Sequence, residues 1–365
     1  MIIQNLKLTH FRNYGFATIA FHPQVNVLTG LNGMGKTNVL DALYYMCLGK
    51  SYFSSGDRHV IMQDKDFFRI ESEVVRYDYP EQIVVKVQAG SKKEIISSGK
   101  KAETIGDHVG RYPVVIIAPD DVQQMLEGSE QRRNFLNNTI IQTDQGYLAD
   151  ILLYNGLLKR RNALLKRFQE SNTFDALLLE SVTTPMFTPA TRIFKRRQQE
   201  TEKLTMLFAE TYSDIVQSNE TCSIVYESQL AAHDLEYLVN RNMDRDRILG
   251  RTTHGIHKDD LVFQMNGVPL RNYASQGQLK SFVLALKIAQ FKMIEQHTDT
   301  KPVLLMDDIF DKLDMNRVRR LLGMLLEKNF GQLFITDTNQ QRMKEILDGL
   351  NVDYALLQVA NGTIC

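Results

Sequence analysis

Two kinds of hydrophobic periodicity divide the chain. Residues 25–29 have the pattern of a buried strand that leads into a glycine-rich loop. Apolar positions then recur at spacings of three and four, which predicts a helix over residues 37–48 packed on a sheet. Between residues 67 and 118, short β-rich runs separated by Gly-Ser pairs predict an antiparallel sheet.

The pattern changes again in the second half of the chain. Residues 121–250 are mostly helical, with a break near Pro185 and a short strand at 223–226. Further along, strands and helices alternate at 261–265, 276–296, 303–306, 317–327 and 333–336.

We therefore predict an α/β protein of two lobes. Residues 1–120 and 255–365 form a P-loop ATPase lobe, with a mixed sheet, flanking helices and an antiparallel β part. Residues 121–254 form a mainly helical second lobe that splits the first. No heptad pattern is long enough for a long coiled coil.

Composition adds few constraints. The 43 basic and 43 acidic residues cancel, so attraction to nucleic acid would have to come from local patches. Cys47, Cys222 and Cys365 show no CxxC spacing and no secretory signal precedes them, which predicts a reduced, intracellular protein. Apolar runs fall far short of the roughly 20 residues that cross a bilayer, so we expect no membrane partner.

The glycine-rich loop matches G-x-x-x-x-G-K-[ST] in full. Its backbone N–H groups would cradle phosphates, its lysine would reach the β and γ phosphates, and its threonine hydroxyl would bind Mg²⁺. A tight strand-to-helix turn is the alternative, but the match should arise by chance only at roughly the one-in-a-hundred level. We predict ATP and Mg²⁺ as ligands, bound by Gly30, Leu31, Asn32, Gly33, Met34, Gly35, Lys36, Thr37 and Asn38.

Two carboxylates follow the apolar run at 303–306. A buried parallel strand that ends in acids is typical of a phosphate site. We expect Asp307 to hold Mg²⁺ together with Thr37, and Asp308 to be the catalytic base that polarises the attacking water. A strand followed by a polar turn is the alternative, which the phosphate loop in the same chain makes less attractive.

The segment Ser275-Gln276-Gly277-Gln278 precedes an amphipathic helix, and Ser275 is a good N-cap candidate. A capping serine is a common structural device, so this segment alone does not indicate function. Its position between the phosphate loop and the Asp-Asp strand, with Lys312-Leu313-Asp314 following, gives the motif order and spacing of ATP-binding-cassette (ABC) ATPases.

Four segments narrow this resemblance. They read L-T-H-F-R-N-Y at 8–14, S-E-Q-R-R-N-F-L at 129–136, H-G-I-H-K-D-D-L at 254–261 and Y-A-S-Q-G-Q-L-K at 273–280. Over residues 1 to about 340 the chain resembles the RecF family of bacterial recombinational DNA repair proteins, which have an ABC/SMC-like ATPase head.

The resemblance implies an ATP-dependent, head-to-tail homodimer. Ser275, Gly277 and Gln278 would face the γ-phosphate bound by the other subunit, where a helix N-terminus suits an anion. Arg12 would approach the nucleotide phosphates, and Asp314 would lie in the D-loop that couples the two sites.

The sequence departs from the general cassette pattern in two places. Many cassette ATPases carry glutamate at the position of Asp308. Aspartate is one methylene shorter and should hold the attacking water less well, so we expect slow turnover of ATP. Where transport cassettes place a γ-phosphate-sensing histidine, the chain reads Asp337-Thr338-Asn339, and either Thr336 or Thr338 could substitute. The glutamine loop stays unassigned.

His254, His257 and the charged residues after them could suggest a metal site. Catalytic zinc normally takes three ligands at set spacings, which are absent here. We therefore predict no zinc and interpret residues 254–260 as a solvated charged turn. The family resemblance implies a structural or allosteric role as the alternative.

A basic stripe offers a DNA contact. Lys159, Arg160, Lys166 and Arg167 project to one side of a helix, and Arg192, Lys195 and Arg196 form a shorter second stripe. A solvated face explains each stripe about as well. The resemblance favours binding to the DNA backbone rather than base readout.

The function that follows is a slow, DNA-stimulated ATPase acting as an ATP-gated clamp on double-stranded or gapped DNA. By resemblance it would promote RecA loading with RecO and RecR and support the SOS response in the bacterial cytoplasm, associated with the nucleoid. An SMC-like chromosome-associated head, expected to carry long coiled-coil arms, and a nuclease-linked ABC ATPase, expected to carry a further acidic domain, are the alternatives.

Overall fold

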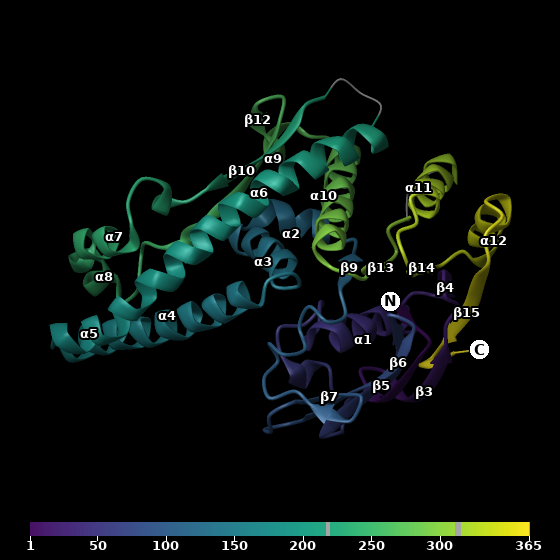
Figure 1. The fold of residues 1–365 in the computed structure, drawn as a ribbon, viewed down its shortest axis with the longest axis horizontal. Helices are drawn as coiled ribbons and strands as arrows, with labels where there is room; N and C mark the ends of the chain where they lie inside the picture. Colours follow the sequence, from purple (N-terminus) through teal and green to yellow (C-terminus); the bar gives the residue numbers. More distant parts are fainter. Residues whose placement is uncertain (217–219, 311–314, 365) are drawn as a thin grey trace. The chain divides into compact units, whose positions relative to one another are not determined.

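The computed structural model describes residues 1–216, 220–310 and 315–364 (Figure 1). The chain forms two compact units. The first comprises Met1–Asp121 and Gln290–Cys365, and the second comprises Val122–Ala289. In the residues described, no helix is long and apolar enough to cross a membrane.

A mostly parallel sheet forms the centre of the first unit. Its order is β16-β15-β4-β14-β13-β9, and only β16 runs antiparallel to its neighbour. All residues of β4, β9, β13 and β14 are buried, which explains their mainly apolar sequences. The strands are β4 (Val25–Thr29), β9 (Val114–Ile117), β13 (Val303–Met306), β14 (Leu333–Asp337), β15 (Tyr354–Ala360) and β16 (Thr363–Ile364).

A second, antiparallel sheet completes this unit. Its path is β3-β2-β5-β6-β7-β8, and β1 pairs with β5. The strands are β1 (Ile2–Ile3), β2 (Asn5–Phe11), β3 (Tyr14–Ala20), β5 (Phe67–Arg76), β6 (Tyr79–Gln88), β7 (Glu94–Ser97) and β8 (Lys100–Lys101). The predicted antiparallel sheet is thus confirmed over residues 67–101, and β1, β2 and β3 extend it. The last run of the predicted sheet, Val114–Ile117, is instead β9 of the parallel sheet, where it pairs with β13.

Helix α1 (Lys36–Leu48) lies between the two sheets. It contacts β9 and β14 of the parallel sheet and β2 and β6 of the antiparallel one. Because both of its sides are covered, every residue of α1 except Thr37 and Asn38 is buried. The unit also contains η1 (Asp57–His59), α11 (Met315–Glu327) and α12 (Gln340–Gly349), the last two packed on each other.

The second unit is mainly helical. Its two longest helices, α4 and α6, contain 27 and 29 residues and pack against each other (Figure 1). The predicted break near Pro185 is the 3-10 turn η2 (Thr184–Met186). The α-helices from this part of the chain are α2 (Asp121–Glu127), α3 (Ser129–Ile140), α4 (Gln145–Ser171), α5 (Ala176–Thr183), α6 (Phe187–Ile215), α7 (Leu235–Arg241), α8 (Met243–Leu249), α9 (Leu270–Tyr273) and α10 (Gln276–His297).

We predicted that the chain re-enters the ATPase lobe at residue 255, but the first unit resumes only at Gln290. Strand β11 (Asp260–Met265) pairs along its whole length with β10 (Cys222–Glu227), and β12 (Val268–Pro269) joins them. Phe282 of α10 packs against Phe208 and Phe263, with ring centroids 4.6 and 5.1 Å apart. Residues 255–289 therefore belong to the helical unit, because their apolar side chains complete its core.

The interpretation of residues 254–260 as a solvated turn is wrong. This segment contains η4 (Ile256–Lys258), preceded along the chain by η3 (Gln229–Ala231), and it is held by buried polar contacts. Asp259 is 1% exposed and accepts hydrogen bonds from Arg197 at 2.6 Å and from the Tyr226 hydroxyl at 2.5 Å. Arg132 makes a bidentate pair with Asp260 at 2.8 Å. Spacing alone could not reveal partners that lie so far away in sequence.

His257 lies in the same segment between two hydrogen-bonding groups. Its Nε2 lies 3.2 Å from the Thr252 carbonyl oxygen, which can only accept, so Nε2 carries the proton. Its Nδ1, 2.9 Å from the Tyr154 hydroxyl, then accepts a hydrogen bond. Burial lowers the pKa of His257 to about 4, and the hydrogen bond to the Thr252 carbonyl oxygen opposes this shift.

This arrangement makes stability depend on pH. The folded-state pKa of His257 lies below its ordinary value of 6.5, so the stabilisation is complete above pH 6.5 and is lost as the pH falls toward 4. Between about pH 7 and pH 5 the wild type should lose about 2 kcal/mol more unfolding free energy than His257→Gln, which cannot titrate. Urea unfolding followed by circular dichroism measures this difference, and identical pH dependence in both proteins would contradict it.

Candidate nucleotide site

The phosphate loop lies between β4 and α1, as predicted. Glycine is needed at two of its positions. Gly30 has φ +150°, and a Cβ there would lie 2.3 Å from the Val359 carbonyl oxygen. Gly35 has φ +113°, and a Cβ would lie 2.6 Å from the Asn13 side chain. At these two positions the positive φ and the close neighbours therefore favour glycine over any larger residue.

Lys36 folds back into the loop. Its ammonium donates to the carbonyl oxygens of Gly30 at 2.7 Å and Leu31 at 3.0 Å. Burial lowers the pKa of Lys36, and the carboxylates of Asp308, Asp307 and Asp337 oppose this shift. The positive charge therefore lies where an anion bound by the loop would meet it.

Thr37 and Asp307 meet although 270 positions separate them in the sequence. The Thr37 hydroxyl lies 2.9 and 3.0 Å from the two carboxylate oxygens of Asp307. The meeting follows from topology, because β4, β14 and β13 run parallel and end at the same edge of the sheet. Burial raises the pKa of Asp307, while hydrogen bonds from Thr336 and Thr37 oppose the shift.

These two side chains fit a magnesium ion. Mg²⁺ prefers oxygen ligands and is usually held by one or two carboxylates together with phosphate oxygens and water. A hydroxyl and a carboxylate within hydrogen-bonding distance at the rim of a phosphate loop supply that chemistry. Within the described parts of the chain, no group of three or more His, Cys, Asp or Glu side chains could hold a metal.

Asp308 and Thr336 complete this end of the sheet. The Thr336 hydroxyl donates to Asp307 Oδ1 at 2.8 Å and accepts from the Asp308 backbone N–H at 2.8 Å. Asp308 has a left-handed backbone, with φ +45°. The sequence left Thr336 and Thr338 as candidates to substitute for the sensing histidine. Thr336 lies at the carboxylates, whereas Thr338 is exposed.

The segment around Arg12 braces the loop through residues that the sequence analysis missed. Asn13 donates to the Met34 carbonyl oxygen at 3.1 Å and accepts from the Asn38 side chain at 2.7 Å. The Tyr14 hydroxyl donates to the Gly35 carbonyl oxygen at 3.1 Å. Their place directly after Arg12 in the family-like F-R-N-Y segment was the available signal.

Arg12 itself points to other partners. Its guanidinium donates to Asp41 at 2.6 and 2.9 Å and to the hydroxyls of Ser51 and Ser54. Asp41 is fully buried on α1. The structure thus places Arg12 in a polar cluster with α1, and its expected contact with nucleotide phosphates remains a prediction.

The end of the chain also touches the loop. In the β15–β16 turn, the Gly362 N–H donates to the Met34 carbonyl oxygen at 3.3 Å, and the Asn361 N–H lies 3.4 Å from the Met34 sulfur. The sequence carried no recognisable signal for this contact. Segments from both ends of the chain therefore fix the middle of the loop.

The signature residues lie in the helical unit at the start of α10. Ser275 and Gly277 are exposed. Ser275 and Gln278 form a reciprocal cap: the Gln278 N–H donates to the Ser275 hydroxyl at 3.3 Å, and the Ser275 N–H donates to the Gln278 side chain at 2.7 Å. The predicted N-cap is confirmed, and it presents a 22-residue helix N-terminus to solvent. Asp314 lies outside the described residues.

The predicted basic stripe is exposed on α4. Lys159, Arg160, Lys166 and Arg167 all reach solvent, while Arg161 between them is buried and paired with Asp246. In the second stripe, Arg192 pairs with Asp150 and Arg196 with Asp144. The second stripe is therefore partly neutralised by acids of α4 and its cap.

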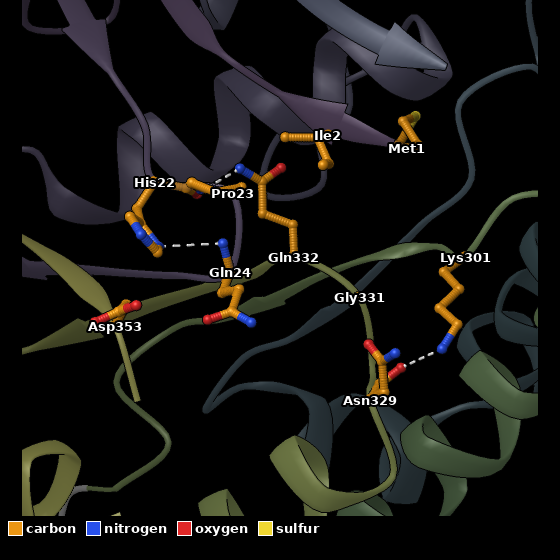
Figure 2. A pocket seen from close by; sticks show the side chains of 10 residues that line it. All are labelled: Met1, Ile2, His22, Pro23, Gln24, Lys301, Asn329, Gly331, Gln332 and Asp353. Carbon is orange, nitrogen blue, oxygen red and sulfur yellow. Dashed lines mark hydrogen bonds between the residues drawn. The ribbon is translucent and has the colours of Figure 1, made fainter. Parts of the chain in front are cut away.

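A cavity of about 510 Å³ lies in the first unit at the opposite ends of the strands (Figure 2). It opens among the segments that precede β4, β13, β14 and β15, whereas Thr37 and Asp307 lie at the other edge. Gln332 in its wall uses its amide to bind Ile3 and His22. None of the site residues predicted from the sequence lines this cavity.

Comparisons with known proteins agree with this geometry. The family model described as RecF/RecN/SMC N terminal domain matches residues 2–363. The chain is 39% identical to the DNA replication and repair protein RecF of Flavobacterium johnsoniae, over 98% of this chain and 100% of the relative. It is 36% identical to the RecF of Porphyromonas gingivalis over the full length of both.

Solved structures show the same relationship. A structure of the recombination mediator protein RecF with ATP, from the RecFOR pathway, matches with a TM-score of 0.89 and 30% identity, covering 100% of this chain and 97% of that one. An Smc head bound to the C-terminal winged-helix domain of ScpA matches at 0.55 and 15% identity, covering 100% and 96%, which shows a shared ABC-type head fold alone. The full-length matches show that this chain belongs to the RecF family of bacterial DNA replication and repair proteins.

Proposed function

We propose that the chain binds and slowly hydrolyses ATP, and that ATP controls how tightly it binds DNA. The contact between the Thr37 hydroxyl and the Asp307 carboxylate carries this proposal. It brings a phosphate loop and a buried acid strand together in the arrangement that nucleotide hydrolysis requires. The matched RecF structure that contains ATP supports the same nucleotide.

Binding uses groups that the fold has already oriented. The loop N–H groups and the N-terminus of α1 would hold the phosphates, and Lys36 would leave its two carbonyl partners for the β and γ phosphates. Thr37 and Asp307 would hold Mg²⁺, which shields phosphate charge when bound. The contacts of Asn13 and Tyr14 with the loop reduce the ordering cost of binding.

Hydrolysis then needs one base and one water. The Asp308 carboxylate would accept a proton as the water oxygen attacks the γ-phosphorus, and the bond to the bridging oxygen would break with its electron pair leaving on ADP. Aspartate has one methylene fewer than the glutamate common in cassette ATPases, so it should hold the water less well. We infer slow turnover, stimulated by DNA.

A second copy would complete the site. The exposed, capped start of α10 carries N–H groups that could face a γ-phosphate bound by the partner subunit. DNA would bind through the exposed stripe on α4 by contacts with the sugar-phosphate backbone. From the RecFOR pathway named for the matched structures, we propose that RecR and RecO assist in loading RecA, that this work supports the SOS response, and that it takes place at the nucleoid.

Asp308→Asn should separate binding from hydrolysis. Without its base the chain should lose at least about 100-fold in kcat while still binding ATP. Sedimentation with ATP and gapped DNA should then show a persistent dimer, and Lys36→Arg, with an altered phosphate contact, should stay monomeric. Unchanged hydrolysis in Asp308→Asn would remove Asp308 from the role of base, and a wild-type monomer under all conditions would disprove the clamp.

Mixing two inactive variants tests the shared site. Lys36→Ala damages the phosphate loop, and Ser275→Arg blocks the signature, so each alone should hydrolyse little ATP. A heterodimer contains one intact site, and random pairing of equal amounts should recover about a quarter of wild-type activity. Absence of both recovered activity and ATP-dependent heterodimers would argue for a site within one subunit.

The α4 stripe should control the salt dependence of DNA binding. Alanine at Lys159, Arg160, Lys166 and Arg167 should weaken binding to duplex DNA and reduce the slope of log K against log salt, by up to about 0.9 for each DNA phosphate that the variant no longer neutralises. Arg192→Ala with Arg196→Ala is the matched control, because both arginines pair with acids at 2.5 and 3.0 Å, whereas Lys166 of the stripe makes a looser pair with Glu170 at 3.8 Å. Equal weakening of DNA binding in the control and the stripe variant would contradict a specific role for this stripe.

A further inference from the structure

The Thr336 hydroxyl lies between the two carboxylate residues of the site. It donates to Asp307 Oδ1 and accepts from the Asp308 N–H, both at 2.8 Å. The Thr336 residue is fully buried near the end of β14, between β4 and β13. One hydroxyl, with one proton to donate and lone pairs to accept, therefore satisfies both neighbours.

We propose that Thr336 is a positioning residue of the hydrolytic site, whose hydroxyl fixes the Asp307 carboxylate and the Asp308 backbone together. This inference rests on the proposed ATPase function and adds a residue to it. It also gives a role to the position just before Asp337, where the histidine of transport cassettes is missing.

The contact between Thr336 and Asp307 matters because Thr37, the other hydroxyl partner of Asp307, is also a proposed ligand of Mg²⁺. Thr37 also donates to Asp307, but in the proposed function it serves as a metal ligand. Thr336 is then the donor that can keep the carboxylate in one orientation throughout. Groups that orient a metal ligand in this way typically change metal affinity or activity by about 10- to 100-fold when removed.

The contact with Asp308 matters because its backbone is unusual. Asp308 has φ +45°, a left-handed conformation that is uncommon outside glycine, although aspartate adopts it more readily than most residues. Its N–H is held by Thr336, which helps to keep the chain in this conformation directly after β13. The backbone conformation sets the direction of the Asp308 side chain, so Thr336 acts on the base through the Asp308 backbone.

A buried threonine on the next strand provides a matched control. Thr29, at the end of β4, is 1% exposed, and within the described chain its hydroxyl has no hydrogen-bond partner. Thr29→Val should therefore keep wild-type behaviour, whereas Thr336→Val keeps the side-chain shape but removes both hydrogen bonds. Thr336→Ser restores the hydroxyl, and Thr336→Ala is a second hydroxyl-free variant in case valine packs poorly.

The test measures ATP binding in EDTA, the Mg²⁺ concentration that half-saturates ATP binding, and kcat. We expect Thr336→Val to bind ATP normally in EDTA, which also shows that it is folded. It should need about tenfold more Mg²⁺ and lose about tenfold or more in kcat. Thr336→Ser and Thr29→Val should resemble the wild type.

Two results would overturn the role of Thr336. One is a wild-type Mg²⁺ requirement and kcat in both Thr336→Val and Thr336→Ala. The other is equal impairment of Thr336→Ser and Thr336→Val, which would make side-chain packing the cause. A wild-type chain that binds no ATP would overturn the proposed function and this role together, whereas normal wild-type activity with an unaffected Thr336→Val would overturn this role alone.

Discussion

The meeting of Thr37 with Asp307 is the contact on which the rest of the site depends. It exists because β4, β14 and β13 are parallel neighbours, so that the loop after one strand and the acids after another reach the same edge. All residues of these strands are buried, as is typical of parallel strands that are covered on both faces. The hydrophobic pattern of the strands thus fixes the geometry of the polar site.

Burial gives this site its electrostatic character. The same desolvation that lowers the pKa of Lys36 raises that of Asp307, since both charged forms lose water. Each group opposes the other's shift because their charges are opposite. In such a partly desolvated place the charges act strongly on a bound polyphosphate, whereas the exposed pair Lys166–Glu170 on α4 is screened by solvent.

The sequence predicted the local elements and the motif-bearing residues well, because these depend on short-range patterns. Strand Val25–Thr29, the helix after the loop and the break near Pro185 are examples. It failed where partners lie far apart in sequence. Asp259 looked solvated because Arg197 and Tyr226 could not be paired with it, and residues 255–289 looked like part of the ATPase lobe because their α/β pattern resembles that of the strands after them.

The middle of the phosphate loop shows why such long-range contacts matter to function. The Met34 carbonyl oxygen accepts from Asn13 near the start of the chain and from Gly362 near its end. Without these contacts the nucleotide would have to order the loop on binding, and the lost conformational entropy would weaken its affinity. In this protein the contacts with Asn13 and Gly362 already order the loop on folding, so less conformational entropy is lost when the nucleotide binds. The phosphate loop is therefore held in place only when segments on both sides of the inserted helical unit have come together, so that ATP binding depends on correct assembly of the first unit.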